Sequence, residues 1–182
     1  MLRGAALENA LRRLPTRPLR GTFFRAVPIE HQRTPLGHAP VMLANRFNLL
    51  AGAHVLYLGA DAHVCVDEVQ VHAVPARPTV IFPVEFDLKA VADLHDPDVL
   101  ATLALTPDDV TFNFRSLGPR GRHVTQLLGE CCASMRCVDG LLFPSAAQAG
   151  GRALAVLEAC LAALGSSLTV HRPGGRVWQR LP

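Results

Sequence analysis

The amino-acid sequence predicts one domain of α+β (mixed α/β) class. The chain has 182 residues, of which 49% are hydrophobic and 18% are charged, a size and composition that suit a single domain with its own buried core. Segments rich in β-branched and aromatic residues alternate irregularly with segments of helical periodicity. Neither an internal repeat nor a shift in composition divides the chain, so we expect one mixed domain.

Helices are predicted by two kinds of signal. Apolar residues recur at helical spacing in residues 4–14, 62–72 and 125–136. Asp96 before Pro97 and Thr106 before Pro107 predict two further helix starts, because Asp and Thr cap helices and proline fits the first helical position.

Strands are predicted where short β-rich runs end in turn signals. These runs are residues 22–27, 54–59, 79–88, 138–143 and 167–172. Pro83 lies inside the third run and predicts an interruption, at a sheet edge or a bulge. Residues 152–164 fit a helix, although their first half also fits a buried strand. Residues 28–41 are expected to be a loop, and residues 45–52 a compact turn.

The charges exclude some classes of protein. The net charge is only +3, whereas nucleic-acid-binding domains usually carry a dense basic face. Lys89 is the only lysine, so nearly every cation is an arginine, whose planar fork suits phosphate and carboxylate. No uncharged apolar run approaches the ~18–20 residues that a membrane span needs. We therefore expect a cytoplasmic protein that binds neither nucleic acid nor membrane directly.

The five cysteines do not form a metal-binding pattern. Cys131, Cys132 and Cys137 lack the paired spacing of a zinc site, and Cys65 and Cys160 stand alone. Unpaired reduced thiols fit a cytosolic protein. We expect these residues to pack in the core and no metal to bind.

No individual catalytic motif is specific, but the order of six short segments along the chain is. Ser145 lacks the flanking glycines of a nucleophile elbow, and the glycines at 118 and 121 do not form a phosphate loop. The ordered segments read Phe-Arg-Ala-Val (24–27), Ala-Asn-Arg-Phe-Asn (44–48), Val-Leu-Tyr-Leu-Gly (55–59), Asp-Glu-Val (67–69), Arg-His-Val-Thr-Gln-Leu-Leu-Gly (122–129) and Gly-Leu-Leu-Phe-Pro-Ser-Ala (140–146). From about Phe23 to about Leu157 this order resembles the RES-domain family, the toxin components of bacterial toxin–antitoxin pairs.

The resemblance implies a fold and an activity. The fold would be similar to that of ADP-ribosyltransferases, with two packed sheets, flanking helices and a central cleft. The whole chain, 1–182, would be one RES-type domain with residues 1–21 as a helical extension. NAD would be consumed as a substrate, not kept as a cofactor, by hydrolysis or phosphorolysis of the nicotinamide–ribose bond. ADP-ribosyl transfer to a protein, or a module that only binds NAD or a partner, remain the alternatives.

Five residues fall on positions of the family's cleft. Arg46, Glu68 and Ser145 match its Arg, Glu and Ser, and we expect them to be catalytic. Arg25 and Tyr57 match two further cleft positions and, with Arg46 and Ser145, are expected to bind NAD.

The chemistry of these residue types is consistent with cleavage of NAD. A carboxylate favours an oxocarbenium-like transition state and can deprotonate an attacking water. Arginine forks bind pyrophosphate, the Tyr57 ring can stack on a flat group, and Ser145 can hydrogen-bond the ribose or the amide. Each residue could also have a purely structural role. Glu68 could lie on a solvated helix face, Tyr57 could pack in the core, Arg25 could form an internal ion pair, and Ser145 could end a strand.

Three departures from the family pattern stand out. Residues 43–45 lack its glycine before the Arg-Phe turn, and Asn45 is the best substitute if that position needs a positive φ. Asp67 adds a second carboxylate beside Glu68. Residues 150–155 replace an Asn-rich strand, and a lost amide there would weaken substrate binding.

The family also implies a partner. A cognate antitoxin with a DNA-binding domain would cover the cleft, and the loop at 28–43 is a candidate lid. A homodimer is compatible with the sequence.

Overall fold

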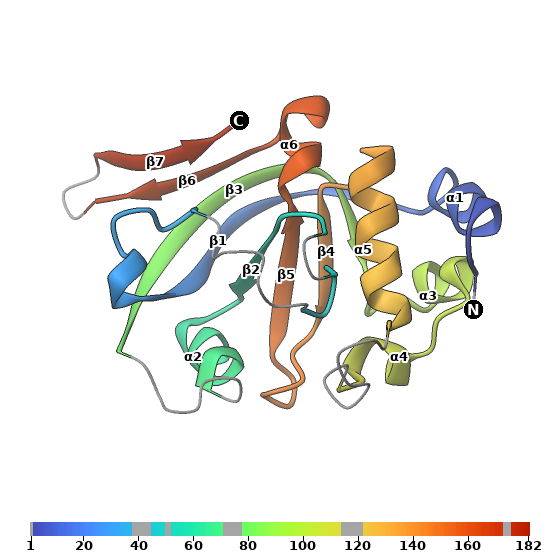
Figure 1. Cartoon of the computed structure of the whole chain (residues 1–182), viewed down its shortest axis with the longest axis horizontal. Coiled ribbons are helices and arrows are strands. Elements are labelled where there is room, and N and C mark those ends of the chain that lie inside the picture. The colour runs from blue at the N-terminus through green and yellow to red at the C-terminus, as the bar shows by residue number, and fades with distance from the viewer. Residues whose placement is uncertain (1, 38–44, 50–51, 71–77, 114–121, 173–175) are drawn as a thin grey trace.

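A computed structural model of the chain describes residues 2–37, 45–49, 52–70, 78–113, 122–172 and 176–182, without the side chains of residues 68–70 (Figure 1). The strands are β1 (Arg17–Pro28), β2 (Val55–Gly59), β3 (Thr79–Asp93), β4 (Gly140–Pro144), β5 (Arg152–Leu157), β6 (Ser167–His171) and β7 (Val177–Leu181). The helices are α1 (Ala5–Leu11), α2 (Ala62–Gln70), α3 (Pro97–Leu103), α4 (Pro107–Thr111), α5 (Val124–Met135) and α6 (Glu158–Leu164), with a 3-10 helix η1 (Ile29–His31).

The strands form two half-sheets that are hydrogen-bonded to each other. Their order is β1-β2-β5-β4-β3-β6-β7, and β1 also pairs with β3. The long strand β3 pairs with β1 along nearly its whole length, and its other side pairs first with β6 and then, in parallel, with β4. One half-sheet therefore contains β1, β3, β6 and β7, and the other contains β2, β5 and β4.

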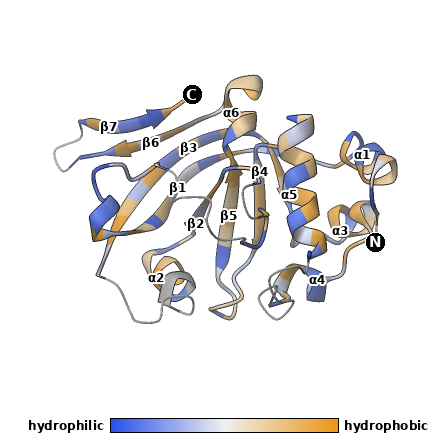
Figure 2. Cartoon of the chain, viewed as in Figure 1, coloured by the Kyte–Doolittle hydropathy of each residue, from blue (hydrophilic) through white to orange (hydrophobic). Residues whose placement is uncertain are grey.

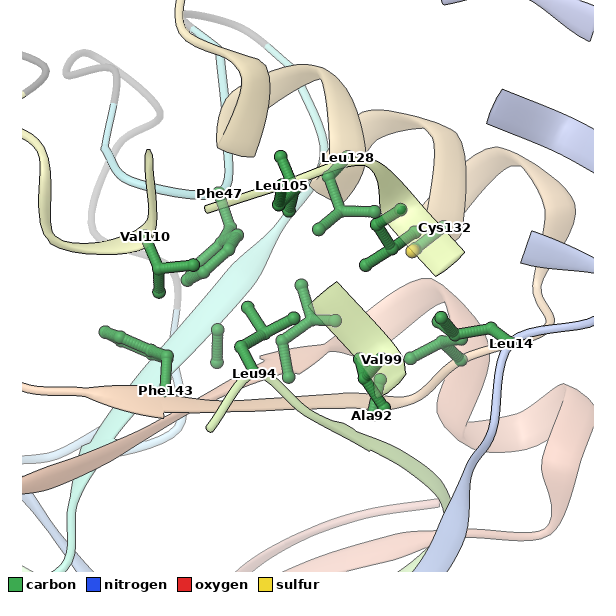
Figure 3. Close-up of a cluster of buried hydrophobic side chains, with 14 of the residues drawn as sticks. Leu14, Phe47, Ala92, Leu94, Val99, Leu105, Val110, Leu128, Cys132 and Phe143 are labelled. Atoms are coloured by element: carbon green, nitrogen blue, oxygen red, sulfur yellow. The ribbon is translucent and has the colours of Figure 1, made fainter. Parts of the chain in front are cut away.

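Two apolar cores pack on the two faces of the β2-β5-β4 half-sheet. The first core lies between the half-sheets and includes Leu58, Phe86 and Val156. The second lies between this half-sheet and the helices and includes Leu128 of α5, Val99 of α3 and Phe143 of β4 (Figure 3). β5 is buried along almost all of its length and carries the hydrophobic colour in Figure 2. The α+β class and the two packed sheets with flanking helices are confirmed.

Both predicted proline helix starts are confirmed. The Asp96 side chain accepts a hydrogen bond from the Asp98 amide at the start of α3. Thr106 and Asp109 form a capping box at the start of α4, in which two main-chain donors are satisfied reciprocally. The periodic segments also form α1, α2 and α5, and residues 71–72 of the second segment lie outside the described residues.

Four features of the secondary structure correct or complete the predictions. Pro83 does not break β3, which runs through it, but it does lie at a sheet edge, as predicted: it pairs with Phe24 of β1 on one side, and the pairing with β6 begins one residue later. Residues 152–164 are a strand up to Leu157 and a helix from Glu158. Strand β7 was not predicted from the sequence. Strand β1 begins at Arg17, five residues before the expected start, so the expected helical extension over residues 1–21 is wrong for residues 17–21, which belong to the sheet.

The cysteines pack as apolar residues. Cys65, Cys132 and Cys160 are buried, and Cys131 and Cys137 pack against the second core. Burial raises the pKa of the Cys160 thiol to about 12, which keeps it protonated and unreactive at neutral pH. Among the described residues, no helix is both long enough and apolar enough to cross a membrane.

Candidate functional site

The carboxyl ends of β2 and β4 lie at one edge of their half-sheet. Both strands are antiparallel to β5, with Gly59 opposite Ala153 and Pro144 opposite Arg152. Helix α2 follows β2, and the loop at 145–151 follows β4, so both lie along the lower edge of the sheet in Figure 1. The topology therefore brings the helix of Glu68 next to the loop of Ser145.

Helix α2 packs directly against that loop. The Asp61 carboxylate accepts a hydrogen bond from the Val64 amide and so caps the first turn of the helix. A Cβ placed on Gly151 would lie 2.9 Å from a Val64 methyl group, which leaves room only for glycine. Glu68 lies one turn further along α2, and its side chain lies outside the described part of the structure.

Ser145 organises the loop that it begins. Its side chain is buried, and Oγ accepts hydrogen bonds of 3.2 Å from the amides of Ala147 and Gln148. The Ser145 amide donates to the Gly151 carbonyl at 2.8 Å and closes the loop. The hydroxyl is therefore held at the end of β4, beside the first turn of α2.

Arg46 lies in a tight turn between Asn45 and Asn48, and its side chain is only 6% exposed. Its guanidinium donates to the main-chain carbonyls of Val110 and Phe112 at the end of α4. It also lies 5.8 Å from the centre of the Phe143 ring, on β4 two residues before Ser145. The turn thus connects α4 to β4, the strand that leads into Ser145.

Tyr57 uses its hydroxyl to hold the same turn. The hydroxyl accepts a hydrogen bond from the Phe47 amide and donates one to Asn48 Oδ1, both at 2.9 Å. The Phe47 ring is fully buried and meets the Phe143 ring edge-on, with 4.9 Å between ring centres. Figure 3 shows Phe47 among Val110, Leu128 and Phe143 in the second core. Tyr57 and Arg46 therefore belong to one structural unit.

Three residues of helix α5 contact this turn or the residues that follow it, and the sequence analysis gave none of them a role. Gln126 donates to the Asn45 carbonyl at 3.0 Å, and Glu130 accepts at 2.9 Å from the amides of Leu49 and Ala53. A Cβ on Gly129 would collide with the Phe47 carbonyl. The only sequence signal was the Thr-Gln-Leu-Leu-Gly run at 125–129, which formed part of the ordered set without a role.

His123 joins the end of α4 to the start of α5. Its ring stacks on Phe112 with 4.6 Å between ring centres, and its Nδ1 lies 2.9 Å from Thr125 Oγ1 in the cap of α5. Burial lowers the pKa of His123, the nearby Asp109 carboxylate opposes that shift, and the Arg46 charge adds to it.

Arg25 points to the other face of the β2-β5-β4 half-sheet. Along β1 it shares a face with Phe23 and Val27, both of which pack in the core between the half-sheets. One amino group donates to the Gly37 carbonyl at 3.3 Å, while Nε is buried and, among the described residues, has no hydrogen-bond partner. Burial lowers the pKa of Arg25 to about 10, and the charges of Cys65 and Glu158 partly offset this shift.

The predicted residues whose side chains are described lie on two sides of the β2-β5-β4 half-sheet. Arg46 lies over the Phe143 ring, two residues before Ser145, on the helix-covered side, and Arg25 lies on the inner side. Helix α2, which carries Glu68, packs against β1, the strand of Arg25, and its Val64 packs against Gly151 in the Ser145 loop. A serine and the strand of a buried arginine thus lie beside the helix that carries a carboxylate, residue types that suit a phosphorylated, sugar-containing ligand, while Arg46 is held at the end of α4.

Asn45 does not have the backbone conformation that the missing glycine suggested. Ala104 and Arg136 are the described non-glycine residues with a positive φ, so the condition under which Asn45 would substitute for the glycine is not met. Asn45 instead accepts a hydrogen bond from the adjacent Arg46 amide through its own side chain.

The sequence of the chain matches a known protein family, and its fold is similar to a solved structure. The family model described as RES domain matches residues 22–176. No curated protein matches the sequence. Among solved structures, the fold is similar to a chain in the crystal structure of the M. tuberculosis MbcT–MbcA toxin–antitoxin complex, with a TM-score of 0.66. The two chains are 22% identical, and the match covers 97% of this chain and 91% of that one.

Proposed function

Because the chain belongs to the RES domain family, we propose that it is an NAD-consuming enzyme and the toxin of a toxin–antitoxin pair. The observation that carries the proposal is that α2, the helix that carries Glu68, packs both against β1, the strand of Arg25, and against the loop that Ser145 begins. The similarity in fold to a chain of a toxin–antitoxin complex supports the second half of the proposal.

The proposed reaction breaks the bond between the ribose C1′ and the nicotinamide nitrogen. The bond electrons stay on nicotinamide, which leaves as a neutral molecule, and positive charge develops on the ribose. The Glu68 carboxylate would stabilise that charge and take a proton from the attacking water, whose oxygen bonds to C1′. In phosphorolysis a phosphate oxygen would replace the water, and in ADP-ribosyl transfer a protein side chain would do so.

The other residues of the site would bind and orient NAD. Arg25 is the stronger candidate for the pyrophosphate, because its buried Nε has no partner among the described residues and a buried donor costs free energy until it is satisfied. The Ser145 hydroxyl is fixed at the end of β4 by two main-chain amides and could bond the nicotinamide-side ribose. Arg46 and Tyr57 are engaged by the protein itself, so they would shape the site around the dinucleotide.

A partner protein is proposed from the same comparison. The solved structure that resembles this chain contains an antitoxin, and we infer that a cognate antitoxin with a DNA-binding domain neutralises this protein. Co-expression with a small DNA-binding protein encoded next to it should relieve the growth arrest that the toxin causes when it is expressed alone. Growth arrest that no neighbouring gene relieves would contradict this part of the proposal.

The decisive experiment measures nicotinamide release from NAD by the purified protein, with water alone and with phosphate. Glu68→Gln should lower the rate by at least about 100-fold, because it removes the charge that stabilises the transition state. Asp67→Asn, the same change on the neighbouring residue, should retain most of the activity. Labelled protein bands instead of free ADP-ribose would indicate protein ADP-ribosylation, and thermal stabilisation by NAD without nicotinamide release would indicate a binding module.

A further inference from the structure

The turn that carries Arg46 is held both by its own hydrogen bonds and by side chains from outside it. Within it, the Asn45 amide donates to the Asn48 carbonyl at 2.9 Å, the reverse bond is long, at 3.4 Å, and the Arg46 amide donates to the Asn45 side chain. From outside, Gln126 donates to the Asn45 carbonyl and the Tyr57 hydroxyl accepts from the Phe47 amide. Because buried main-chain groups are almost always hydrogen-bonded, the position of the turn depends on these outside side chains.

One face of α5 provides several of these partners. Gln126, Gly129 and Glu130 are spaced i, i+3 and i+4, which places them on one side of a helix. Gln126 donates to the first carbonyl of the turn, Gly129 allows the Phe47 carbonyl to approach the helix backbone, and Glu130 accepts from the amides that follow the turn. The three residues hold the beginning, the middle and the end of one segment.

We infer that Gln126 and Glu130 are positioning residues that set where Arg46 lies in the active site. This inference rests on the proposed function. Neither residue needs to contact the substrate; both act through the main chain of residues 45–53. Small displacements of a binding group can cost an enzyme about 100-fold in rate, so loosening this clamp should lower activity even while the fold persists.

Gln126→Glu isolates this role from helix stability. The Gln126 amide oxygen accepts from the His123 amide in the cap of α5, at 2.9 Å, while the amide nitrogen donates to the Asn45 carbonyl. Glutamate is the same size, keeps the acceptor for His123 and suits the third position of a capping box. The substitution replaces only the side-chain nitrogen that donates to the Asn45 carbonyl, and it places an oxygen next to that carbonyl. Repulsion between the two oxygens should displace the turn, while the cap of α5 is kept.

Glu130→Gln and Glu130→Ala form a graded pair. Glutamine keeps an oxygen that can accept from the Leu49 and Ala53 amides, whereas alanine leaves both amides without this acceptor. If Glu130 positions the turn, the glutamine variant should recover most of the activity that the alanine variant loses. A matched control is Asn9→Asp on the exposed face of α1, which makes the same amide-to-acid change as Gln126→Glu far from the turn.

The experiment measures nicotinamide release together with trypsin cleavage after Arg46, followed by mass spectrometry. We expect Gln126→Glu to lower kcat/KM by roughly 30- to 100-fold and to raise cleavage after the normally buried Arg46. Because Gln126 is buried and the variant places a carboxylate there, the melting temperature should fall by roughly 5–10 °C, while the protein stays folded at the assay temperature. Glu130→Gln should remain within about fivefold of wild-type activity and Glu130→Ala should fall below it by at least tenfold. Asn9→Asp should match wild type in both readouts.

The result that overturns the inference is a folded Gln126→Glu with wild-type kcat/KM and no added cleavage. Equal losses of activity in Glu130→Gln and Glu130→Ala would also overturn it, because glutamine keeps the acceptor for the Leu49 and Ala53 amides and alanine does not. If wild-type protein releases no nicotinamide, the proposed function fails, but cleavage after Arg46 still tests the clamp. If Glu130→Ala does not fold, Gln126→Glu alone decides.

Discussion

The two arginines of the candidate site lie in opposite environments. Arg46 donates to the carbonyls of Val110 and Phe112 and lies over the Phe143 ring. Within the described part of the chain, Arg25 makes one long hydrogen bond, to Gly37, and its buried Nε has no partner. Burial lowers the pKa of Arg25 to about 10. The fold satisfies the first cation and leaves the second incompletely paired. A difference of this kind separates a residue that supports the site from one that awaits an anionic ligand.

Arg46→Met tests the first half of this comparison and should have the largest effect. The substitution removes the donors to two carbonyls at the end of α4 and leaves those buried acceptors unsatisfied. We expect the free energy of unfolding to fall by about 2–4 kcal/mol and nicotinamide release to be lost. Urea denaturation of both proteins measures the change, and a variant as stable as wild type would show that Arg46 does not support the fold.

Arg25→Met tests the second half and should change stability in the opposite direction. Methionine fills a similar apolar volume without a buried charge, and replacing an incompletely compensated buried ion in this way is often neutral or stabilising. We expect an increase of about 1–3 kcal/mol in the free energy of unfolding, together with loss of the stabilisation that added NAD gives to wild type. Destabilisation comparable to that of Arg46→Met would remove the distinction between the two arginines.

The stability difference between wild type and Arg25→Met should also depend on pH. The folded protein holds the Arg25 proton less tightly than the unfolded chain, because its pKa is lowered to about 10 from an ordinary 12.5. The cost of the buried charge is therefore fully present at neutral pH and declines as pH rises through about 10. Urea denaturation at pH 7.5 and pH 10.5 should show the gap narrowing at the higher pH; a gap that widens would contradict this assignment.

Local signals in the sequence predicted most elements of the fold. Asp96-Pro97 and Thr106-Pro107 begin helices because capping and proline geometry act within a few residues. The prediction was incomplete where a distant partner decides the outcome. Pro83 lies at a sheet edge, as predicted, but it does not break β3, because that residue pairs with Phe24 on one side while the pairing with β6 starts one residue later. Strand β7 pairs with the edge that β6 offers; its run of five residues was too short to be predicted from its own sequence.

The candidate site shows the same division between local and distant causes. The ordered motifs named Arg25, Arg46, Tyr57, Glu68 and Ser145, and whether they act on NAD remains a prediction. Their environments could not be predicted, because the burial of Arg25 and the bond between Tyr57 and the Arg46 turn both depend on strand pairing. Gln126 and Glu130 were missed as partners of the turn for a related reason: they lie about 80 residues from it in sequence.

His123 gives the smallest effect and reports the charge on Arg46 directly. Burial is the main reason that its pKa is lowered, and the Arg46 charge adds to the shift while Asp109 opposes it. Because the folded pKa lies below the unfolded value of about 6.5, His123 stabilises the fold above that pH and loses its contribution as pH falls through the folded pKa. Protonation also removes the Nδ1 lone pair, with which His123 caps α5.

His123→Asn keeps a capping side chain but cannot titrate. Between pH 7 and pH 5, wild type should lose a few tenths of a kcal/mol more stability than this variant, a small difference because the ring is partly solvated. NMR titration of the His123 ring measures the pKa itself. In Arg46→Met that pKa should rise toward its ordinary value, and in Arg25→Met it should not move, since Arg25 lies on the other face of the half-sheet. Equal shifts in both variants would show that the two cations do not occupy separate environments.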